Sequence, residues 1–204
     1  MIAPAVPLRT LRIATINLWN RSEPYAARML HAGQCLSRLA PDVIGLQEAF
    51  AGGGRNQAGE LGAREAYHVL WHPAGAIDGG TIGNAVLSRY PIRGGAVRRL
   101  PHADGAIGRI VVRADIDLPE GELHFFCTHL SYRADESYKR EEQVVAVNGF
   151  VREATRELPR ILVGDFNADP ESTEIRFLTG KATIGGRSAY YQDSAAIVGA
   201  AVPT

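Results

Sequence analysis

The sequence contains few cysteines, and their number and spacing argue against a disulfide-rich scaffold and against a cysteine metal site. Cys35 and Cys127 are its only two cysteines, far apart and without the spacing of a metal-binding motif. A framework of several disulfides is therefore excluded, and one Cys35–Cys127 disulfide remains an alternative to two reduced thiols. We expect two buried thiols, as in a protein of a reducing compartment.

Long apolar runs and an excess of charge of one sign are absent as well. No stretch approaches the roughly 20 apolar residues of a membrane-spanning helix, and residues 1–10 lack the apolar core of a signal peptide. Lys and Arg number 22, as do Asp and Glu, so no global basic field attracts nucleic acid. These absences predict a cytoplasmic protein without a transmembrane segment, and the length predicts a single domain over residues 1–204.

The most informative segment that is present is Gly-Asp-Phe-Asn-Ala-Asp-Pro, from Gly164 to Pro170. It follows the short apolar run Ile161–Val163, which is typical of a buried strand. Asp165 and Asn167 therefore come where a strand ends and the backbone turns. A carboxylate in that place can orient or deprotonate a water, and an amide can donate a hydrogen bond to a phosphate oxygen. The pair suits a hydrolytic site.

Two other interpretations of this segment exist. Asp165, Asn167 and Asp169 match the first, third and fifth positions of a calcium loop, but Pro170 and Arg176 stand where that loop needs glycine and glutamate. The calcium loop is therefore rejected. For the segment taken alone, an ordinary Asn/Asp turn leading into a helix remains an alternative.

The apolar pattern along the chain predicts a mixture of strands and helices. Strands are expected over Leu11–Asn17, Val43–Gln47, Tyr67–His72, Ile82–Ser88, Ala96–Leu100, Ile107–Leu118, Glu122–Thr128 and Ile161–Val163. Helices are expected over Tyr25–Leu39, Gln57–Ala66, Asp135–Leu158 and Glu171–Leu178. Helices interrupt the strands, and a run of strands occupies the middle of the chain. The fold class is therefore an α/β or α+β sandwich in which helices cover sheets.

A polar group follows each of four predicted strands. These groups are Asn17, Glu48, His129 and the pair of Asp165 and Asn167. Taken singly, each has an ordinary explanation, such as a turn amide, a solvated charge or a hydrogen-bonded histidine. Taken together they indicate an active site, because such sites gather at the strand ends of α/β sheets. The other histidines are expected to be structural or solvated: His31, His68, His72, His102 and His124.

Five segments carry a resemblance to a known family. They are Ile16-Asn17, Pro41-Asp-Val-Ile-Gly-Leu-Gln-Glu48, Gly83-Asn-Ala-Val-Leu-Ser-Arg-Tyr-Pro-Ile92, Thr128-His-Leu130 and Gly164-Asp-Phe-Asn-Ala-Asp-Pro170, with Arg140 and Gln143 matching in the expected long helix. In this order they resemble the endonuclease/exonuclease/phosphatase superfamily, metal-dependent phosphoesterases built like deoxyribonuclease and neutral sphingomyelinase.

The resemblance implies a four-layer sandwich, with two mixed β-sheets packed face to face between helices. It implies that Glu48, with Asn17 beside it, binds Mg²⁺ or Mn²⁺. It implies that His129 and Asn167 bind the phosphate, and that Asp165 aligns or deprotonates the attacking water. The implied function is metal-dependent hydrolysis of a phosphoester, either a phosphodiester or a phosphomonoester.

One element of the family pattern is missing, an Asp-His pair near the C-terminus whose histidine activates the water. No histidine follows His129, and Asp193 is followed by Ser194. We expect the chain to be a fragment of a longer enzyme that lacks the last strands, and we expect weak catalysis from these 204 residues. The alternative is a natural short form, and with it a non-catalytic phosphate- or phospholipid-binding module on the same fold.

The motifs leave the substrate open among small molecules, lipid headgroups and nucleic acid. The zero net charge favours a smaller phosphodiester or phosphomonoester over bulk DNA. No protein partner is indicated by any segment.

Overall fold

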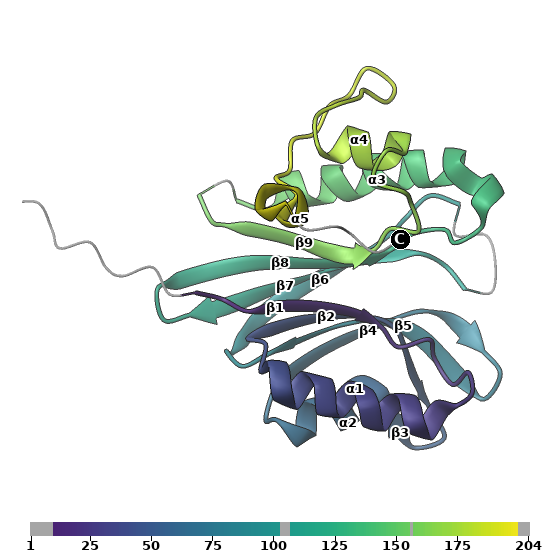
Figure 1. Ribbon diagram of the computed structural model, residues 1–204, viewed down its shortest axis with the longest axis vertical. Helices are drawn as coiled ribbons and strands as arrows, with labels where there is room; N and C mark the ends of the chain where they lie inside the picture. The colour runs from purple at the N-terminus through teal and green to yellow at the C-terminus, as the bar shows by residue number, and fades with distance from the viewer. Residues whose placement is uncertain (1–9, 103–106, 156, 200–204) are drawn as a thin grey trace, which may run out of the picture.

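Two β-sheets pack face to face in the computed structural model, which describes residues 10–102, 107–155 and 157–199 (Figure 1). The first sheet has the strand order β1-β2-β5-β4, and a two-residue strand β3 pairs with β2. Strands β1 and β2 run parallel, and the other pairs run antiparallel. The strands are β1 (Ile13–Asn17), β2 (Val43–Gly52), β3 (Arg55–Asn56), β4 (His68–Ile77) and β5 (Gly80–Ser88).

The second sheet has the order β6-β7-β8-β9. Its first three strands form an antiparallel meander, and β9 joins β8 in parallel. A parallel pair needs a crossover, and the helix between β8 and β9 supplies it. The strands are β6 (Ile92–Arg99), β7 (Ile110–Leu118), β8 (Gly121–His129) and β9 (Arg160–Asp165).

Helices cover the outer face of each sheet and complete four layers (Figure 1). Two lie on the first sheet, α1 (Tyr25–Leu39) and α2 (Gln57–Arg64). Two more lie over the second sheet, α3 (Ser137–Glu153) and α4 (Thr173–Leu178), with a 3₁₀ turn (Ala134–Glu136) before α3 and a short helix α5 (Ser194–Val198) near the end of the described chain. The predicted α/β sandwich of two mixed sheets is confirmed. No helix in the described ranges is long and apolar enough to cross a membrane.

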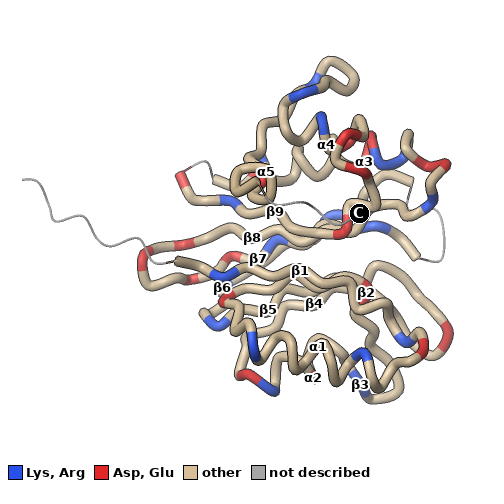
Figure 2. The backbone as a smooth tube through the Cα atoms, in the orientation of Figure 1, with Lys and Arg blue, Asp and Glu red and all other residues tan. Residues whose placement is uncertain are grey.

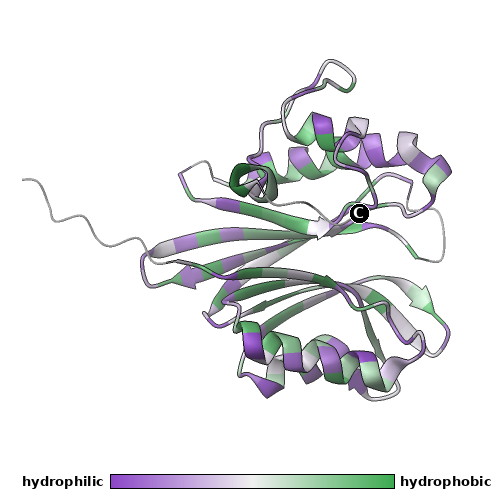
Figure 3. Cartoon of the chain, in the orientation of Figure 1, coloured by the Kyte–Doolittle hydropathy of each residue, from purple (hydrophilic) through white to green (hydrophobic). Residues whose placement is uncertain are grey.

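The central strands β2, β5, β7 and β8 are mostly buried on both faces, because each sheet has a partner sheet on one side and helices on the other. In β8, for example, Phe125 packs between the sheets, whereas its neighbour Phe126 packs against α3, and both are fully buried. Apolar stretches accordingly run along the strands of both sheets (Figure 3). The amide of Asn84 in β5 donates to the carbonyl of Ile110 in β7 at 3.1 Å and links the two sheets.

Both cysteines are free thiols, and no disulfide joins them. Cys127 lies between the sheets, where Gln47 Nε2 is 3.1 Å from its sulfur, and burial raises the pKa of this thiol to about 12. Cys35 is only half-buried, so the expectation of two buried thiols is correct for Cys127 alone.

Several predicted boundaries are wrong: β6 begins at Ile92 and not at Ala96, and β4 continues to Ile77 and not only to His72. Three other differences have identifiable reasons. The expected helix Asp135–Leu158 is a 3₁₀ turn followed by α3, which ends at Glu153 because Ala154 is extended and the chain must turn toward Pro159 and β9; residue 156 lies outside the described residues. The expected strand Ile107–Leu118 begins at Ile110, because residues 107 and 108 contact β4 of the other sheet. The third boundary, at Glu48, concerns the site.

Candidate functional site

Glu48 lies within strand β2 and not at its end, as the sequence had suggested. The register between β2 and β5 shifts between Leu46 and Ala49, and Glu48 has a left-handed backbone with φ of 52°. A bulge of this kind inserts an unpaired residue and redirects its side chain, so β2 continues to Gly52 while Glu48 turns into a cavity. Glu48 as a whole is half-buried.

His129 and Asp165 meet because β8 and β9 are parallel and in register. The two residues are direct partners at the ends of these strands, and His129 Nε2 lies 3.8 Å from Asp165 Oδ2. Asn17 ends β1 and lies opposite Gln47 of β2, next to the bulge. The C-terminal ends of β1, β8 and β9 therefore open into the same cavity as Glu48.

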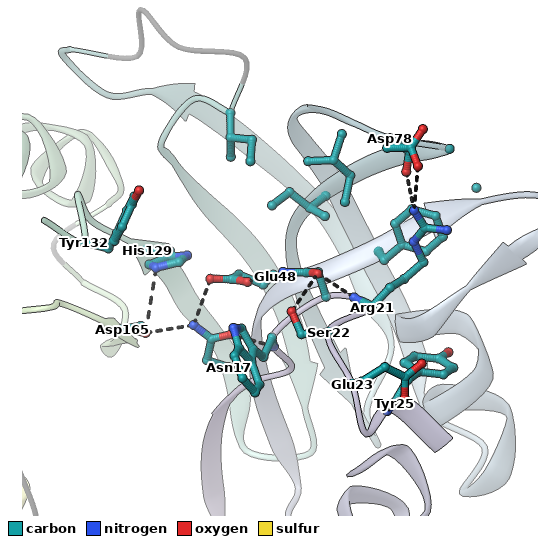
Figure 4. Close-up of a pocket in the computed structure, with 18 of the residues that line it drawn as sticks. Asn17, Arg21, Ser22, Glu23, Tyr25, Glu48, Asp78, His129, Tyr132 and Asp165 are labelled. Atoms are coloured by element: carbon teal, nitrogen blue, oxygen red, sulfur yellow. Dashed lines mark hydrogen bonds and ion pairs between the residues drawn. The ribbon is translucent and has the colours of Figure 1, made fainter. Parts of the chain in front are cut away.

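The amide of Asn17 joins the two carboxylates of this cavity (Figure 4). Its Nδ2 donates to Asp165 Oδ2 at 2.9 Å and to Glu48 Oε1 at 3.4 Å, while its Oδ1 accepts from the backbone of Trp19 at 2.8 Å. Asn20 donates to the other oxygen of Glu48, Oε2, at 2.8 Å. Two amides thus orient one carboxylate and hold it near the second.

Asn167 is fixed by the backbone around it. Its side chain donates to the carbonyl of Leu130 at 3.2 Å, and its own backbone N–H donates to Asp165 Oδ1 at 3.1 Å. Its φ of 49° is left-handed, a conformation that asparagine adopts more readily than most residues. The amide therefore ties the end of β9 to the segment after His129, and one of its two N–H groups remains to meet a ligand.

Arg109 is a site residue that the sequence analysis missed. Its Nη1 lies 3.1 Å from Nδ1 and 3.4 Å from Nε2 of His129, and its guanidinium stacks on the ring of Tyr132 at 5.7 Å. Burial lowers the pKa of Arg109, and the nearby carboxylates of Glu48 and Asp165 oppose that shift. An arginine in a protein stays protonated, so Arg109 brings a fixed positive charge into the cavity.

Burial and the charge of Arg109 lower the pKa of His129 to about 4, so the imidazole is neutral at pH 7. An arginine can only donate, and therefore the nearer ring nitrogen, Nδ1, accepts. The proton then resides on Nε2, the nitrogen that faces Asp165. His129 thus offers one N–H donor and no charge at this end of the sheet.

A buried ion pair holds the segment that follows His129. Arg140 Nε of α3 donates to Glu174 Oε1 of α4 at 2.7 Å, and Arg140 Nη1 donates to the carbonyls of Ser131 and Arg133. Gln143 accepts from the backbone of Ser131 at 3.0 Å. The two helix positions that matched the family pattern therefore support the site from behind and do not reach into the cavity.

The cavity has a volume of about 970 Å³ and extends well past the residues described so far. One part contains all five predicted site residues together with Arg109. The other part, beyond Trp19 and Asn20, is lined by the loop before α1, the β2–β3 hairpin and the β4–β5 turn. The predicted residues are thus brought together in one place, while their individual roles stay predictions.

A second group of acidic and imidazole side chains lies at the opposite end of β7 and β8. Ligand atoms of Asp115, Glu122 and His124 lie within 4.8 Å of one another and could hold a metal ion. His124 Nδ1 is, however, 2.7 Å from Asp115 Oδ1, and Arg113 Nε is 2.9 Å from the same oxygen. The group is therefore already an internal ion network, and none of its residues lines the main cavity.

Comparison with known sequences gives one family. The profile of the endonuclease/exonuclease/phosphatase family matches residues 14–195. No curated protein matches the chain by sequence.

Solved structures of low sequence identity share the fold. The human Nocturnin catalytic domain with bound sulfate has a TM-score of 0.72 at 19% identity, over 83% of this chain and 68% of that one. An endonuclease/exonuclease/phosphatase from Beutenbergia cavernae has a TM-score of 0.68 at 23% identity, over 84% and 53%. A mannosyl-6-phosphatase from Bacteroides thetaiotaomicron has a TM-score of 0.67 at 22% identity, over 82% and 69%. The chain thus spans between 53% and 69% of the length of these three chains.

Proposed function

This chain belongs to the endonuclease/exonuclease/phosphatase family, and from that premise we propose that it is a Mg²⁺- or Mn²⁺-dependent hydrolase of phosphoester bonds. The observation that carries the proposal is the convergence of two carboxylates, Glu48 and Asp165, on the amide of Asn17. They share an open cavity with the donors His129 and Arg109. Carboxylates for a metal and a water, beside donors for a phosphate, are the parts that such a hydrolysis needs.

The donor set fits a hard divalent cation. Glu48 is half-buried and the hydrogen-bond partners of its carboxylate are neutral amides, so among the described residues no arginine or lysine forms an ion pair with it. Carboxylate oxygens suit Mg²⁺ and Mn²⁺. Bound there, the ion would polarise a phosphoryl oxygen and stabilise the leaving oxygen. We assign Glu48 as the ligand, with Asn17 beside it to fix the carboxylate.

The other side chains act on the water and the phosphate. Asp165 orients the attacking water and accepts its proton, because its carboxylate is held by Asn17 and by the backbone of Asn167. His129 donates from Nε2 to a phosphate oxygen, and Asn167 donates its remaining N–H. Arg109 supplies the positive charge that balances the developing negative charge on phosphorus.

The test is hydrolysis of p-nitrophenyl phosphate and bis(p-nitrophenyl) phosphate by the purified chain, with Mg²⁺ and with excess EDTA. We expect turnover that EDTA abolishes and that Asp165→Ala lowers by on the order of 10³-fold or more, while Asp165→Ala still binds Mg²⁺ in calorimetry. Asp117→Ala, at the far end of β7, is the matched control and should leave the rate unchanged.

Two results would count against the proposal. If Asp165→Ala kept full activity, the assignment of Asp165 to the attacking water would be wrong. Binding of both esters without any turnover would favour the phosphate-binding module over the hydrolase.

A further inference from the structure

The cavity continues away from the phosphate-binding groups into a part that we call the distal lobe. It is lined by Arg21, Glu23 and Tyr25 before and at the start of α1, by Phe50 and Arg55 of the β2–β3 hairpin, and by Asp78 of the β4–β5 turn. The whole cavity, at about 970 Å³, is at the upper end of the range for small-molecule sites, about 300–1,000 Å³. A phosphate alone would leave the distal lobe unused (Figure 4).

The distal lobe is polar and its charges compensate one another. Arg21 donates to the backbone carbonyl of Asp78 and lies 3.8 Å from its carboxylate, with the guanidinium 4.6 Å above the ring of Phe50. Arg55 covers Tyr25 at 5.4 Å and forms two hydrogen bonds to a carboxylate outside the cavity. The lining of the lobe thus contributes two guanidinium groups against the two carboxylates of Glu23 and Asp78.

This lining disfavours two classes of substrate. A nucleic acid strand would place further phosphates in the distal lobe, and their binding requires an excess of positive charge that the lobe does not have. A lipid chain would cover charged groups without replacing their hydrogen bonds, which costs free energy. Lys and Arg positions alternate with Asp and Glu positions along the described chain, so neither sign of charge dominates the surroundings (Figure 2).

A neutral group with many hydroxyls matches the lining. Each hydroxyl both donates and accepts, so it can serve a guanidinium and a carboxylate at once. The fork of Arg21 and the neighbouring carboxylate of Asp78 present the two kinds of partner side by side. The Phe50 ring beneath Arg21 limits where that guanidinium can move and so favours a defined geometry.

We propose that the distal lobe selects the alcohol portion of the substrate, and that this portion is a neutral polyhydroxylated group, a sugar or polyol carrying a phosphomonoester. The proposal rests on the proposed phosphoesterase function. In the reaction, the water oxygen bonds to phosphorus, the bond from phosphorus to the sugar oxygen breaks, and the proton of the water ends on the released sugar hydroxyl. Arg21 and Asp78 are the specificity-determining residues.

The experiment compares kcat/KM for mannose 6-phosphate, a short oligothymidylate with a 5′-phosphate and p-nitrophenyl phosphate, with Mg²⁺. We expect the hexose phosphate to exceed the oligonucleotide by about tenfold or more, the value of one charged hydrogen bond. In Arg21→Met and Asp78→Asn, the ratio of mannose 6-phosphate to p-nitrophenyl phosphate should fall by about tenfold. Arg93→Met, which also removes an exposed arginine from a carboxylate, is the control and should keep the ratio.

Preference for the oligonucleotide, or an unchanged ratio in both variants, would overturn the proposal. If no ester is hydrolysed, the phosphoesterase function fails, and calorimetric binding of mannose 6-phosphate then tests the distal lobe by itself. If the original chain binds mannose 6-phosphate and Arg21→Met binds it more weakly, the assignment of the distal lobe stands. If the original chain does not bind it, or if Arg21→Met binds it equally well, the assignment is wrong.

Discussion

The two ends of strand β8 carry similar side chains in different surroundings. At one end His129 neighbours Arg109 and Asp165, and at the other His124 neighbours Arg113 and Asp115. These two histidines are five residues apart, or about 17 Å along the strand.

The two groups differ in how completely their charges are paired. His124 lies 2.7 Å from its aspartate, and the arginine lies 2.9 Å from the same oxygen, so each group has an opposite partner. His129 lies 3.8 Å from its aspartate and faces an arginine, while the carboxylates nearby are held by neutral amides. Incomplete charge pairing beside a large cavity leaves groups available to a ligand, whereas the charges around His124 are paired with one another.

The largest expected effect tests which end binds the metal. Glu48→Gln should weaken Mg²⁺ binding and lower kcat/KM by on the order of 10³-fold, because an amide is a poor substitute for an anionic ligand. Glu122→Gln, the same change at the other end, should leave both values within about twofold, because surface changes away from a site have small effects. Calorimetry with Mg²⁺ and ester hydrolysis measure the two outcomes. If Glu122→Gln abolished metal binding, the comparison would be reversed.

The second-largest expected effect distinguishes the two histidines, one by its effect on catalysis and the other by its effect on stability. His129→Asn should lower kcat/KM by about 10²- to 10³-fold, the usual loss for one donor to a developing oxyanion. His124→Asn should instead lower the free energy of unfolding by about 1–3 kcal/mol, because it removes a buried bond to a charged partner. Kinetics and urea unfolding of both variants separate the roles. Equal kinetic losses would mean that His124 also serves the site.

The arginines give a smaller kinetic effect and a spectroscopic one. Arg109→Met should lower kcat/KM by about 10- to 10²-fold, the value of charged hydrogen bonds. It should also raise the pKa of His129 from about 4, because the Arg109 charge is one cause of the low value, although burial remains the larger cause. NMR titration of the imidazole measures that shift, and Arg113→Met should leave it unmoved. A His129 pKa unchanged in Arg109→Met would exclude the electrostatic contact.

The last effect concerns stability and appears only in acid. The low pKa of His129 means that the unfolded chain binds a proton from about pH 6.5 downward while the folded chain does not until about pH 4. Stability is therefore lost as pH falls through this window, by on the order of 3 kcal/mol. In metal-free buffer, the free energy of unfolding should fall between pH 7 and pH 4 by that much less in His129→Asn than in the original chain. If the urea midpoints of the two proteins differed by the same amount at every pH, the low pKa of His129 would be refuted.

Most secondary-structure elements and the family motifs could be predicted, because they depend on local sequence. Apolar periodicity locates most strands and helices, and the motifs place Asp165 and His129 at strand ends. The bulge at Glu48 could not be predicted from the sequence. A glutamate with a left-handed backbone within a strand results from the pairing of β2 with β5 and not from the propensity of glutamate itself. Cytoplasmic location and the single-domain extent stay predictions.

Arg109 and Asn20 were missed for a different reason. Arg109 reaches His129 from the segment just before β7, where residues 107 and 108 contact β4 of the first sheet, and no motif marks that contact. Asn20 stands three residues after Asn17 in a loop, where asparagine is an ordinary turn residue, and only the folded chain brings it to Glu48. Contacts between distant segments are what the sequence alone does not show.

The left-handed backbone around the cavity also bears on attempts to redesign the protein. The described chain has seven non-glycine residues of this kind, and four of them line the main cavity: Trp19, Asn20, Glu48 and Asn167. Each such residue costs about 1 kcal/mol relative to a relaxed conformation. A thermostability screen that rewards relief of strain will therefore favour glycine at these positions, and the more robust variants it selects will be the ones that have lost the site.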